Sequence, residues 1–367
     1  MAKRITKVVL TGGPAAGKTT LISRILKEFE QDDGWRVITI PETATELISG
    51  FGIKPFGGCM SRLEFQDFVI ADQLHKEKLA LDAAQLVPEE NVLLLYDRAL
   101  MDDKAYVSDE DFARVLARFG GRTEERVLKN YDLVLHLITC AKGAEFAYNL
   151  GNAARTESIE YAREMDDRTL RAWSAHPNLR IIDNDVNFSS KIERGLREIY
   201  RAVGRSEPMA KKRKYLIAMP DMAAFARKYR TAAIDMTQTY LVLTNPAIER
   251  RVRRQRSGNE YLCFYTEKHL RDSGEKWGTE RPISEKQYRK YLLERDETLA
   301  PVHKTKYRFV YGDRRCEIDV YPFCADKAVL FQYGEAKAPL PEEITVLREV
   351  TGEAAYKNRA LAASQRL

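Results

Sequence analysis

The sequence predicts two domains of different fold class: an α/β domain built on a parallel sheet, then an α+β domain built on an antiparallel barrel. The chain has 367 residues, which is long for a single domain. Strand-like runs alternate with helical segments as far as Gly204, and beyond it short strand-like runs follow one another. The polar, helix-breaking stretch Gly204–Pro208 separates the two patterns. We therefore expect domains at 1–204 and 211–367, joined by a linker over 205–210.

The composition is that of an ordinary globular protein, with 44% hydrophobic and 31% charged residues. No apolar run approaches the roughly 20 residues that cross a bilayer, and the first ten residues lack the pattern of a secretion signal. The five cysteines have neither CxxC nor Cys/His spacing, so we expect reduced thiols rather than disulfides or a zinc module. These features predict a cytoplasmic protein without a transmembrane segment.

The formal net charge of +6 is unevenly distributed along the chain. Residues 1–204 hold 28 basic and 32 acidic residues, whereas residues 205–367 hold 32 basic and 22 acidic residues. The second domain should therefore favour phosphate-rich ligands, such as a polyphosphate, a nucleotide, an acidic lipid or a nucleic acid. The alternative is a basic surface that is merely solvated.

In the first domain, apolar runs predict strands at Lys7–Thr11, Arg36–Ile40, Val92–Asp97, Asp132–Ile138 and Arg180–Ile182. Amphipathic spacing predicts helices at Thr19–Phe29, Arg62–Leu81 and Ser158–Trp173. Strands that alternate with helices typically form a parallel sheet covered on both faces.

A glycine-rich loop follows the first strand and leads into the first helix. Its sequence, Gly12-Gly-Pro-Ala-Ala-Gly-Lys18-Thr19, matches the phosphate-binding loop in the strand–loop–helix context that this motif requires. Backbone N–H groups and the helix N-terminus bind phosphate oxygens, Lys18 reaches the β- and γ-phosphates, and the Thr19 hydroxyl binds Mg²⁺. We predict that ATP or GTP binds with Mg²⁺ at Gly12, Gly13, Pro14, Ala15, Ala16, Gly17, Lys18, Thr19 and Thr20. The alternative is a glycine turn into a helix.

Two further strand ends carry candidate catalytic residues. Asp97 ends an apolar run, which directs a carboxylate toward the water shell of the metal, and Arg98 follows it. The alternative for Asp97 is a helix or turn cap. After the second strand, Glu42 is a candidate base toward an acceptor hydroxyl. Glu42 and Glu46 are four residues apart, so they equally fit one solvated helix face.

Arg155 and Arg163 precede the last strand of the first domain. Arginines in such a position can fold over a bound nucleotide and stabilise the charge on the transferred phosphoryl group. As helix-surface residues paired with neighbouring glutamates, they would have only a structural role.

Residues 6–200 resemble the NadR-like AAA subgroup of P-loop proteins, which is related to nicotinamide riboside kinases and deoxynucleoside kinases. The matching stretches are Gly12–Thr19, Pro41–Leu47, Tyr96–Arg98, Tyr131–Val134 and Asn152–Arg163. The resemblance implies a kinase-type core in which Glu42 approaches the acceptor, and Asp97 and Arg98 lie near metal and phosphate. It does not specify the acceptor. The chain lacks an Asn-Lys-x-Asp stretch, which removes one argument for a Ras-like GTPase but leaves GTP open.

In the second domain we predict strands at Arg213–Met219, Ala233–Thr244, Arg250–Arg256, Tyr261–Glu267, Lys304–Tyr311, Arg314–Tyr321 and Ala328–Tyr333. Helices are expected only at Asp221–Arg230, at Ser284–Asp296 and in the tail after Pro341. Short, mostly consecutive strands favour an antiparallel sheet or barrel.

Charged residues recur at alternate positions on several of these strands, and residues two apart on a strand point to the same face. Repeated over several strands, the pattern predicts a lumen lined by the cations Lys214, Arg251, Arg253, Lys268, Lys306 and Arg308, with the carboxylates Glu317 and Asp319. Such a lumen suits a polyphosphate ligand. Taken one strand at a time, each alternation equally fits an edge strand with a solvated face.

Residues 211–362 resemble the CYTH or triphosphate-tunnel family in the order and spacing of their motifs. These are Lys214–Ile217, Ile234–Leu241, Arg251-x-Arg253, Thr266-x-Lys268, Lys306-x-Arg308, Glu317-x-Asp319, and Glu349–Thr351 with Tyr356 and Asn358. Catalytic members begin with Glu-x-Glu-x-Lys, whose carboxylates bind metal, but Ala210–Lys214 retains only the last lysine. A later Glu-x-Glu strand is replaced by Gln332-Tyr-Gly334. Because two-metal hydrolysis needs those carboxylates, we expect a barrel that binds phosphate without cleaving it.

Together these features predict a Mg²⁺-dependent phosphotransferase or NTPase whose barrel binds a phosphorylated small molecule, polyphosphate or acidic phospholipid. The fusion itself resembles a family whose eukaryotic relatives are regarded as GTP-binding and acidic-phospholipid-binding regulators. This implies an alternative, a nucleotide-operated regulatory protein. A nucleic-acid kinase is the third alternative: Arg250–Arg256 supplies positive charge, but aromatic residues for base stacking are sparse in that strand.

Overall fold

The computed structural model describes residues 3–30, 32, 34–53, 55, 60–150, 158–208, 211–257, 260–270, 276–312, 314–334 and 337–367. The chain divides into two compact units. The first comprises Met1–Ile182 and Phe188–Leu196, and the second Asp183–Asn187 and Arg197–Leu367.

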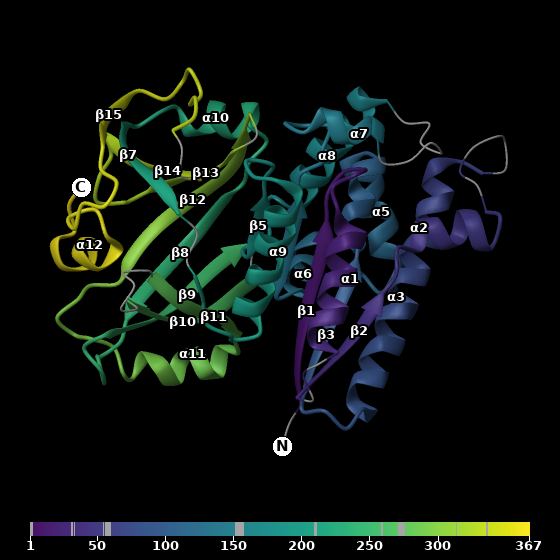
Figure 1. Ribbon diagram of the computed structural model, residues 1–367, viewed down its shortest axis with the longest axis horizontal. Coiled ribbons are helices and arrows are strands. Elements are labelled where there is room, and N and C mark those ends of the chain that lie inside the picture. Colours follow the sequence, from purple (N-terminus) through teal and green to yellow (C-terminus); the bar gives the residue numbers. More distant parts are fainter. Residues whose placement is uncertain are drawn as a thin grey trace. The chain divides into compact units, whose positions relative to one another are not determined.

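The first unit contains a five-stranded parallel sheet in the order β2-β3-β1-β4-β5, with helices on both of its sides (Figure 1). Its strands are β1 (Arg4–Thr11), β2 (Trp35–Ile40), β3 (Asn91–Asp97), β4 (Leu133–Leu137) and β5 (Leu179–Ile182). The helical elements are α1 (Lys18–Phe29), α2 (Thr43–Thr45), η1 (Glu46–Gly50), α3 (Arg62–Leu86), α4 (Leu100–Asp103), η2 (Lys104–Tyr106), α5 (Asp109–Arg118), α6 (Glu124–Lys129), α7 (Glu145–Leu150), α8 (Ile159–Trp173) and α9 (Phe188–Ala202), the last of which contributes to both units. The predicted parallel α/β class, its five strands and its three helices are confirmed.

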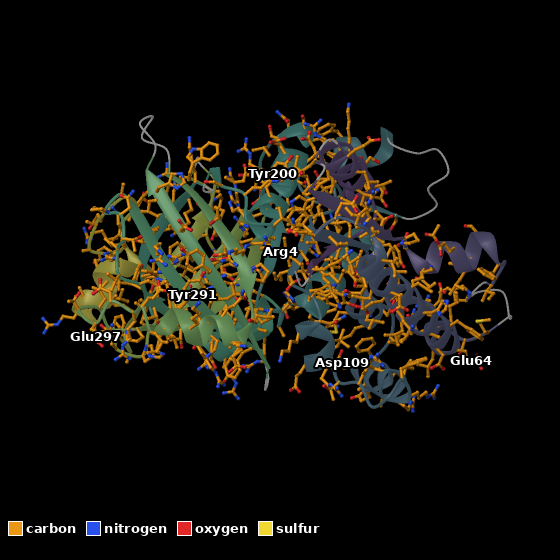
Figure 2. The ribbon with its side chains drawn as sticks, turned by 90° about the horizontal axis from the view of Figure 1, so that it is seen from below. Arg4, Glu64, Asp109, Tyr200, Tyr291 and Glu297 are labelled. Atoms are coloured by element: carbon orange, nitrogen blue, oxygen red, sulfur yellow. The ribbon has the colours of Figure 1, made fainter. Side chains whose placement is uncertain are left out.

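Local sequence signals fix where several helices begin. The Ser61 hydroxyl accepts a hydrogen bond from the Glu64 amide, and the Glu64 carboxylate accepts one from the Ser61 amide, so α3 starts with a capping box (Glu64 is labelled in Figure 2). Ser158 caps α8 in the same way, through the Tyr161 amide. The central strand lies in the core, where Val8, Val9 and Leu10 are fully buried, because helices cover both faces of a parallel sheet.

The second unit contains a ten-stranded antiparallel sheet in the order β15-β7-β14-β13-β12-β8-β9-β10-β11-β6. Its strands are β6 (Glu207–Pro208), β7 (Lys212–Ala218), β8 (Ala233–Tyr240), β9 (Ile248–Ser257), β10 (Glu260–Leu270), β11 (Lys276–Ile283), β12 (Val302–Tyr311), β13 (Arg314–Val320), β14 (Lys327–Tyr333) and β15 (Val346–Glu349). Its remaining helices are α10 (Met222–Lys228), α11 (Glu285–Leu292) and α12 (Asn358–Ser364). The α+β antiparallel class and all seven predicted strands are confirmed.

Three strands were not predicted. β11 contains Gly278 and Pro282, which weaken a strand signal, and β6 has only two residues within the stretch expected to be a linker. The tail after Pro341 was expected to be helical throughout, which is wrong, because it first forms β15 and only later α12. All four residues of β15 are exposed, so this strand carries no buried alternation from which to recognise it.

The outer face of the antiparallel sheet is apolar and packs against helices. Phe225 of α10 lies against Phe309, with ring centroids 4.9 Å apart. On α11, Tyr291 (labelled in Figure 2) stacks on Tyr265 of β10 at 4.7 Å. The opposite face carries the charged residues and forms the interior of the barrel.

Among the described residues, no helix combines the length and the apolar character needed to span a membrane.

Candidate functional site

The loop between β1 and α1 has the backbone shape of a phosphate cradle. Gly12, Ala15 and Gly17 have positive φ angles of 134°, 57° and 94°. At Gly17, a side-chain Cβ would lie 2.8 Å from the ring of Phe188, so only glycine fits both the angle and the space. Helix α1 begins at Lys18, and its Nζ donates hydrogen bonds of 3.1 Å to the carbonyl oxygens of Gly12 and Gly13. Thr19 and Thr20 lie in the first turn of α1.

Charged residues from the ends of β2 and β3 converge beside this loop. Arg98 donates from Nε to Glu42 Oε1 at 2.5 Å and from Nη1 to Asp102 Oδ1 at 3.2 Å. The Thr11 hydroxyl donates to the same oxygen of Asp102 at 2.5 Å, which ties β1 to the start of α4. Arg98 adopts φ 67°, a left-handed conformation that is strained for an arginine. Tertiary contacts must hold it there, and its two ion pairs do so.

Glu42 and Glu46 have different surroundings, although both follow β2. The carboxylate of Glu46 pairs with Lys76 of α3, whereas Glu42 binds Arg98 and accepts a second hydrogen bond from Thr45 at 2.8 Å. The two side chains therefore do not form a single solvated face.

The donor set fits a divalent cation near the loop. Asp97 Oδ1 is buried, and within the described residues it has no hydrogen-bond partner. Burial raises the pKa of Asp97, and the charge of Glu42 raises it further, whereas Lys18 lowers it. A cation bound beside Asp97 would favour the ionised carboxylate. Thr19 lies at the start of α1, where its hydroxyl could serve as a second oxygen ligand.

The pKa values of Lys18 and Glu42 are both lowered, for different reasons. Burial, together with the charge of Arg98, lowers the pKa of Lys18 to about 8. Burial alone would raise the pKa of Glu42, but Arg98 and Lys18 hold it below its ordinary value. Glu42 is therefore an ionised carboxylate at neutral pH. An anion bound beside Lys18 would stabilise its ammonium form.

Of the two arginines expected to form a lid, only Arg163 can be placed, because Arg155 lies outside the described residues. Arg163 donates from Nε to the Ala141 carbonyl at 2.6 Å and from Nη2 to Glu145 at 2.8 Å. It thus links α8 to α7, and its half-exposed guanidinium is already engaged.

A second charged site lines one face of the antiparallel sheet. Strand register places on this face Lys212, Lys214, Phe331, Tyr333, Arg315, Glu317, Asp319, Lys304, Lys306, Arg308, Gln238, Arg251, Arg253, Thr266, Lys268 and Glu280. Although these side chains are mostly polar, many are nearly inaccessible, including Lys306 at 7% and Arg308 at 5% exposure. Lys268 and Lys212 interact electrostatically across the interior although their strands are six positions apart in the sheet. The sheet therefore curls into a barrel around this face.

Carboxylates compensate part of the positive charge inside the barrel. Arg253 makes a bidentate pair with Glu280, with both distances 3.0 Å. Asp319 pairs with Lys304 and, at 2.8 Å, with Lys306, which also pairs with Glu317. The face predicted from alternation is thus enclosed and is not a solvated edge.

One expectation about the barrel is wrong. Gln332 was taken to stand where a metal-binding carboxylate would face the lumen, but Phe331 is the residue of β14 that lies opposite Glu317. Gln332 points to the other face, where its Nε2 donates to the carbonyls of Ala338 and Pro339. Phe331 and Tyr333 occupy the interior positions instead.

A family model described as "AAA domain" matches residues 7–191, just over half of the chain. The chain belongs to the AAA domain family. None of the curated proteins that were compared matches the chain. Among solved structures it is similar to the inorganic triphosphatase NE1496, with 24% identity over 43% of this chain and 97% of that one at a TM-score of 0.31. It is also similar to deoxyadenosine kinase from M. mycoides with bound dATP, with 16% identity over 53% of this chain and 98% of that one at a TM-score of 0.36.

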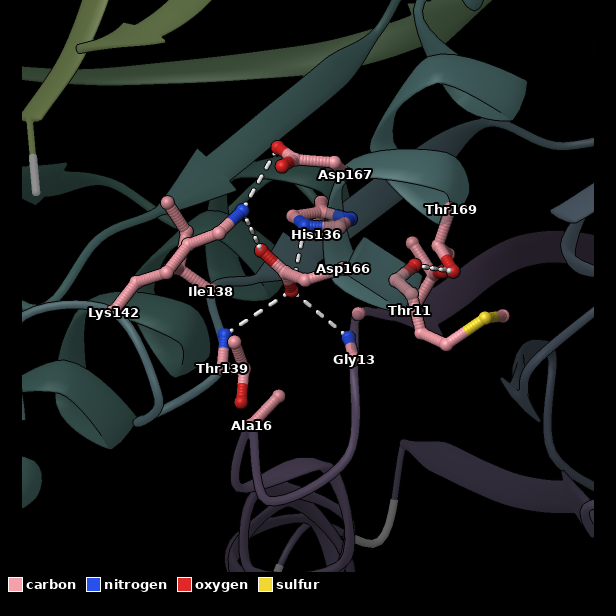
Figure 3. Close-up of polar contacts among 12 residues, drawn as sticks. Thr11, Gly13, Ala16, His136, Ile138, Thr139, Lys142, Asp166, Asp167 and Thr169 are labelled. Carbon is pink, nitrogen blue, oxygen red and sulfur yellow. Dashed lines mark hydrogen bonds and ion pairs between the residues drawn. The ribbon is translucent and has the colours of Figure 1, made fainter. Parts of the chain in front are cut away.

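The AAA domain holds its phosphate loop through a buried carboxylate that the sequence analysis missed. Asp166 of α8 accepts hydrogen bonds from the Gly13 amide at 2.9 Å and the Thr139 amide at 3.1 Å (Figure 3). His136 Nε2 lies 3.2 Å away, and Lys142 donates to the other carboxylate oxygen at 2.9 Å. These contacts join β1, β4 and α8 at one point.

This network also explains Gly13. Its N–H is engaged by Asp166, and a Cβ there would lie 2.9 Å from the Asp166 Cβ, so glycine permits the approach of α8. Some 150 residues separate the two in sequence, and Asp166 itself is one of many acidic residues on an amphipathic helix. The loop motif was recognisable in the sequence, but it does not indicate which residue elsewhere in the chain binds the loop.

We predict that Asp166→Asn destabilises the protein by about 3 kcal/mol at neutral pH, because it leaves buried amides and a lysine without their anion. Burial would raise the pKa of Asp166, but His136 and Lys142 hold it well below its ordinary value. The carboxylate thus stabilises the fold above the unfolded pKa of about 3.9, and this contribution is lost as pH falls toward the folded pKa. Urea unfolding between pH 3 and pH 7 should show a loss for Asp166→Asn that shrinks in acid.

Asp167→Asn is the matched control for this experiment. Asp167 is half-exposed, and among the described residues its ion pair is the one with Lys142 at 2.9 Å, so its loss should cost no more than about 0.5 kcal/mol. Equal costs for the two variants would show that the buried network does not support the loop.

Proposed function

We propose that the AAA domain, residues 1–204, is a Mg²⁺-dependent phosphotransferase that uses ATP or GTP and is NadR-like in its chemistry. We further propose that the barrel, residues 211–367, binds a phosphorylated ligand without cleaving it. In this proposal the nucleotide and its acceptor meet beside the phosphate loop.

The observation that carries the proposal is the convergence of Lys18, Glu42 and Asp97 from three different strand ends onto one loop. Their electrostatic coupling is direct, since Glu42 and Asp97 both act on Lys18. A phosphoryl-transfer site needs a cation at the phosphates, a metal ligand and a base near the acceptor, and these residues supply one of each. A simple nucleotide-binding loop requires no carboxylate such as Glu42.

Each side chain has a distinct role in the proposed reaction. Lys18 neutralises the β- and γ-phosphates, and α1 contributes its N-terminal amides. Asp97 and Thr19 hold Mg²⁺, which supplies charge neutralisation on the phosphate oxygens when it is bound. Glu42 accepts the proton of the acceptor hydroxyl, and Arg98 keeps Glu42 ionised and oriented. Arg155 and Arg163 are the candidates for stabilising the charge on the transferred group.

We predict that Lys18→Ala lowers nucleotide turnover by about a hundredfold or more, because it removes the cation at the transferred phosphate. Full-length protein would be incubated with ATP or GTP, Mg²⁺ and a pooled set of nucleosides, nucleotides and phosphorylated metabolites, and the products analysed. For the wild type we expect acceptor-dependent formation of ADP or GDP together with a new phosphorylated product. Lys27→Ala, on the exposed side of the same helix, is the control and should retain activity. Retained turnover in Lys18→Ala would place the chemistry elsewhere.

We predict that Glu42→Gln lowers kcat for transfer by about 10²- to 10⁴-fold while nucleotide binding is kept, as expected for the loss of a general base. Because the pKa of Glu42 is depressed, the wild type should keep its activity as pH falls to about 5. Glu46→Gln is the matched control, since Glu46 pairs with Lys76 and not with Arg98. Equal rates for Glu42→Gln and wild type in single-turnover experiments would remove Glu42 from the mechanism.

The second candidate function is a nucleotide-operated regulatory protein whose barrel binds acidic phospholipid or polyphosphate. The observation in its favour is that both interior carboxylates of β13 are engaged by lysines, which suits a binding role for the barrel better than metal-dependent cleavage. Slow hydrolysis that is indifferent to every acceptor in the product analysis would support this candidate.

A further inference from the structure

The barrel interior contains cations that carboxylates compensate only in part. Glu317 and Asp319 act on Lys212 of β7, and Glu249 and Glu280 act on Lys268 of β10, but burial outweighs them and lowers both pKa values. Nε of the buried Arg251 has no hydrogen-bond partner among the described residues. Arg251 makes one long ion pair within the described residues, from Nη1 to Glu249 Oε1 at 3.9 Å. Other cations are also close: Arg251 and Lys212 both lower the pKa of Lys268. The three groups thus face one enclosed space, where a bound anion would favour their charged forms.

Lys212 stands beside the carboxylates that a metal would need. Its ammonium lies 4.4 Å from the ring centre of Phe331 and 5.2 Å from that of Tyr333, and it interacts with Glu317 and Asp319. The cations around it are Lys214, Lys306 and Lys268. A lysine at this place repels a divalent cation from the interior.

The donor set of the barrel does not fit a divalent metal. Glu317 and Asp319 are its two carboxylates on β13, and lysines engage both of them. Glu280, on the far side, is held by both nitrogens of Arg253. Within the described residues of the barrel, no group of three or more His, Cys, Asp or Glu side chains is placed to hold a metal ion. A cation of charge two would have to displace these ion pairs and enter a space that is already positive.

We propose that the barrel binds a linear polyphosphate, of the tripolyphosphate class, directly and without a divalent cation, with Lys212, Lys268 and Arg251 supplying the charge that a metal would supply. This inference deepens the proposed phosphate-binding function and rests on it. The required chemistry is a chain of adjacent phosphates, because these three cations come from β7, β9 and β10 and face one enclosed interior. The chain is either free polyphosphate or the triphosphate of a nucleotide.

The test uses the full chain carrying Lys18→Ala. This substitution disables the phosphate loop, so that the binding measured is that of the barrel. Inorganic tripolyphosphate would be titrated calorimetrically in EDTA and then in Mg²⁺. We expect binding in EDTA at least as tight as in Mg²⁺, since Mg²⁺ neutralises the ligand. A parallel titration with ATP distinguishes the sources: equal affinity points to a nucleotide triphosphate, and tighter binding of tripolyphosphate to the free chain.

Three variants in this background identify the cations. Lys212→Gln and Lys268→Gln should each weaken binding in EDTA by about tenfold, the worth of one charge-assisted contact. Lys212→Arg should restore binding, which separates loss of charge from misfolding. Lys286→Gln, on the exposed side of α11, is the matched control and should bind as the parent does.

The protonation of Lys212 gives a second readout. Burial lowers its pKa to about 7 against the opposing pull of Glu317, so above pH 7 the free protein must take up a proton to bind the anion. Calorimetry in buffers of different ionisation enthalpy should show proton uptake at pH 8 that is smaller in Lys212→Arg.

The outcomes separate this inference from the proposed function. Binding that requires Mg²⁺, or that is unchanged in both Lys212→Gln and Lys268→Gln, overturns the metal-free arrangement and leaves phosphate binding by the barrel intact. No binding in either EDTA or Mg²⁺ overturns phosphate binding by the barrel itself. Neither result bears on the AAA domain, whose turnover is measured separately in protein with Lys18 intact.

Discussion

The same constraint applies to both units: burying a charged side chain costs free energy unless a counter-ion lies beside it. In the AAA domain, Arg98 is held in a left-handed conformation because Glu42 and Asp102 engage it from two sides. In the barrel, two carboxylates of β13 are shared among the lysines of β12. In each case the counter-ions come from neighbouring strands, so the fold must form before the charges can be buried. The shape of each site therefore depends on pairing between distant segments.

The sequence predicts this structure well where one local rule decides the outcome. The phosphate loop was recognisable because a fixed spacing of glycine, lysine and threonine sits between a strand and a helix. The inner face of the barrel was recognisable because residues two apart on a strand share a face, and the charges of Arg251 and Arg253 obey that period. Whether that face is enclosed or solvated was undecidable from one strand. Only the curling of the whole sheet answers that question.

Prediction fails where support comes from a distant part of the chain. Asp166 is indistinguishable in sequence from Asp167 beside it, yet one is fully buried on the loop and the other is half-exposed. The facing of Gln332 was misjudged because a shift of one residue along a strand exchanges its two faces, and the register against Glu317 is not written in β14 itself. Sequence spacing thus shows which functional groups a segment carries. The strand register in the folded protein decides which of them face the site.

Four lysines of the described residues form two groups, which differ in the direction of their pKa shifts. Lys142 has a raised pKa, which burial opposes and which arises because Asp166 and Asp167 bind it. Lys18, Lys212 and Lys304 have pKa values lowered to about 8, about 7 and about 8, with burial as the largest cause. A lysine of the first group has its anion within the protein and serves the fold. In the second group, Lys304 pairs with Asp319. Among the described residues, Lys18 donates hydrogen bonds to backbone carbonyls and Lys212 lies against two aromatic rings, while carboxylates act on both lysines without outweighing burial. A buried cation so poorly compensated costs stability unless an external anion binds to it. Phosphate, at the loop and in the barrel, is the anion that we propose.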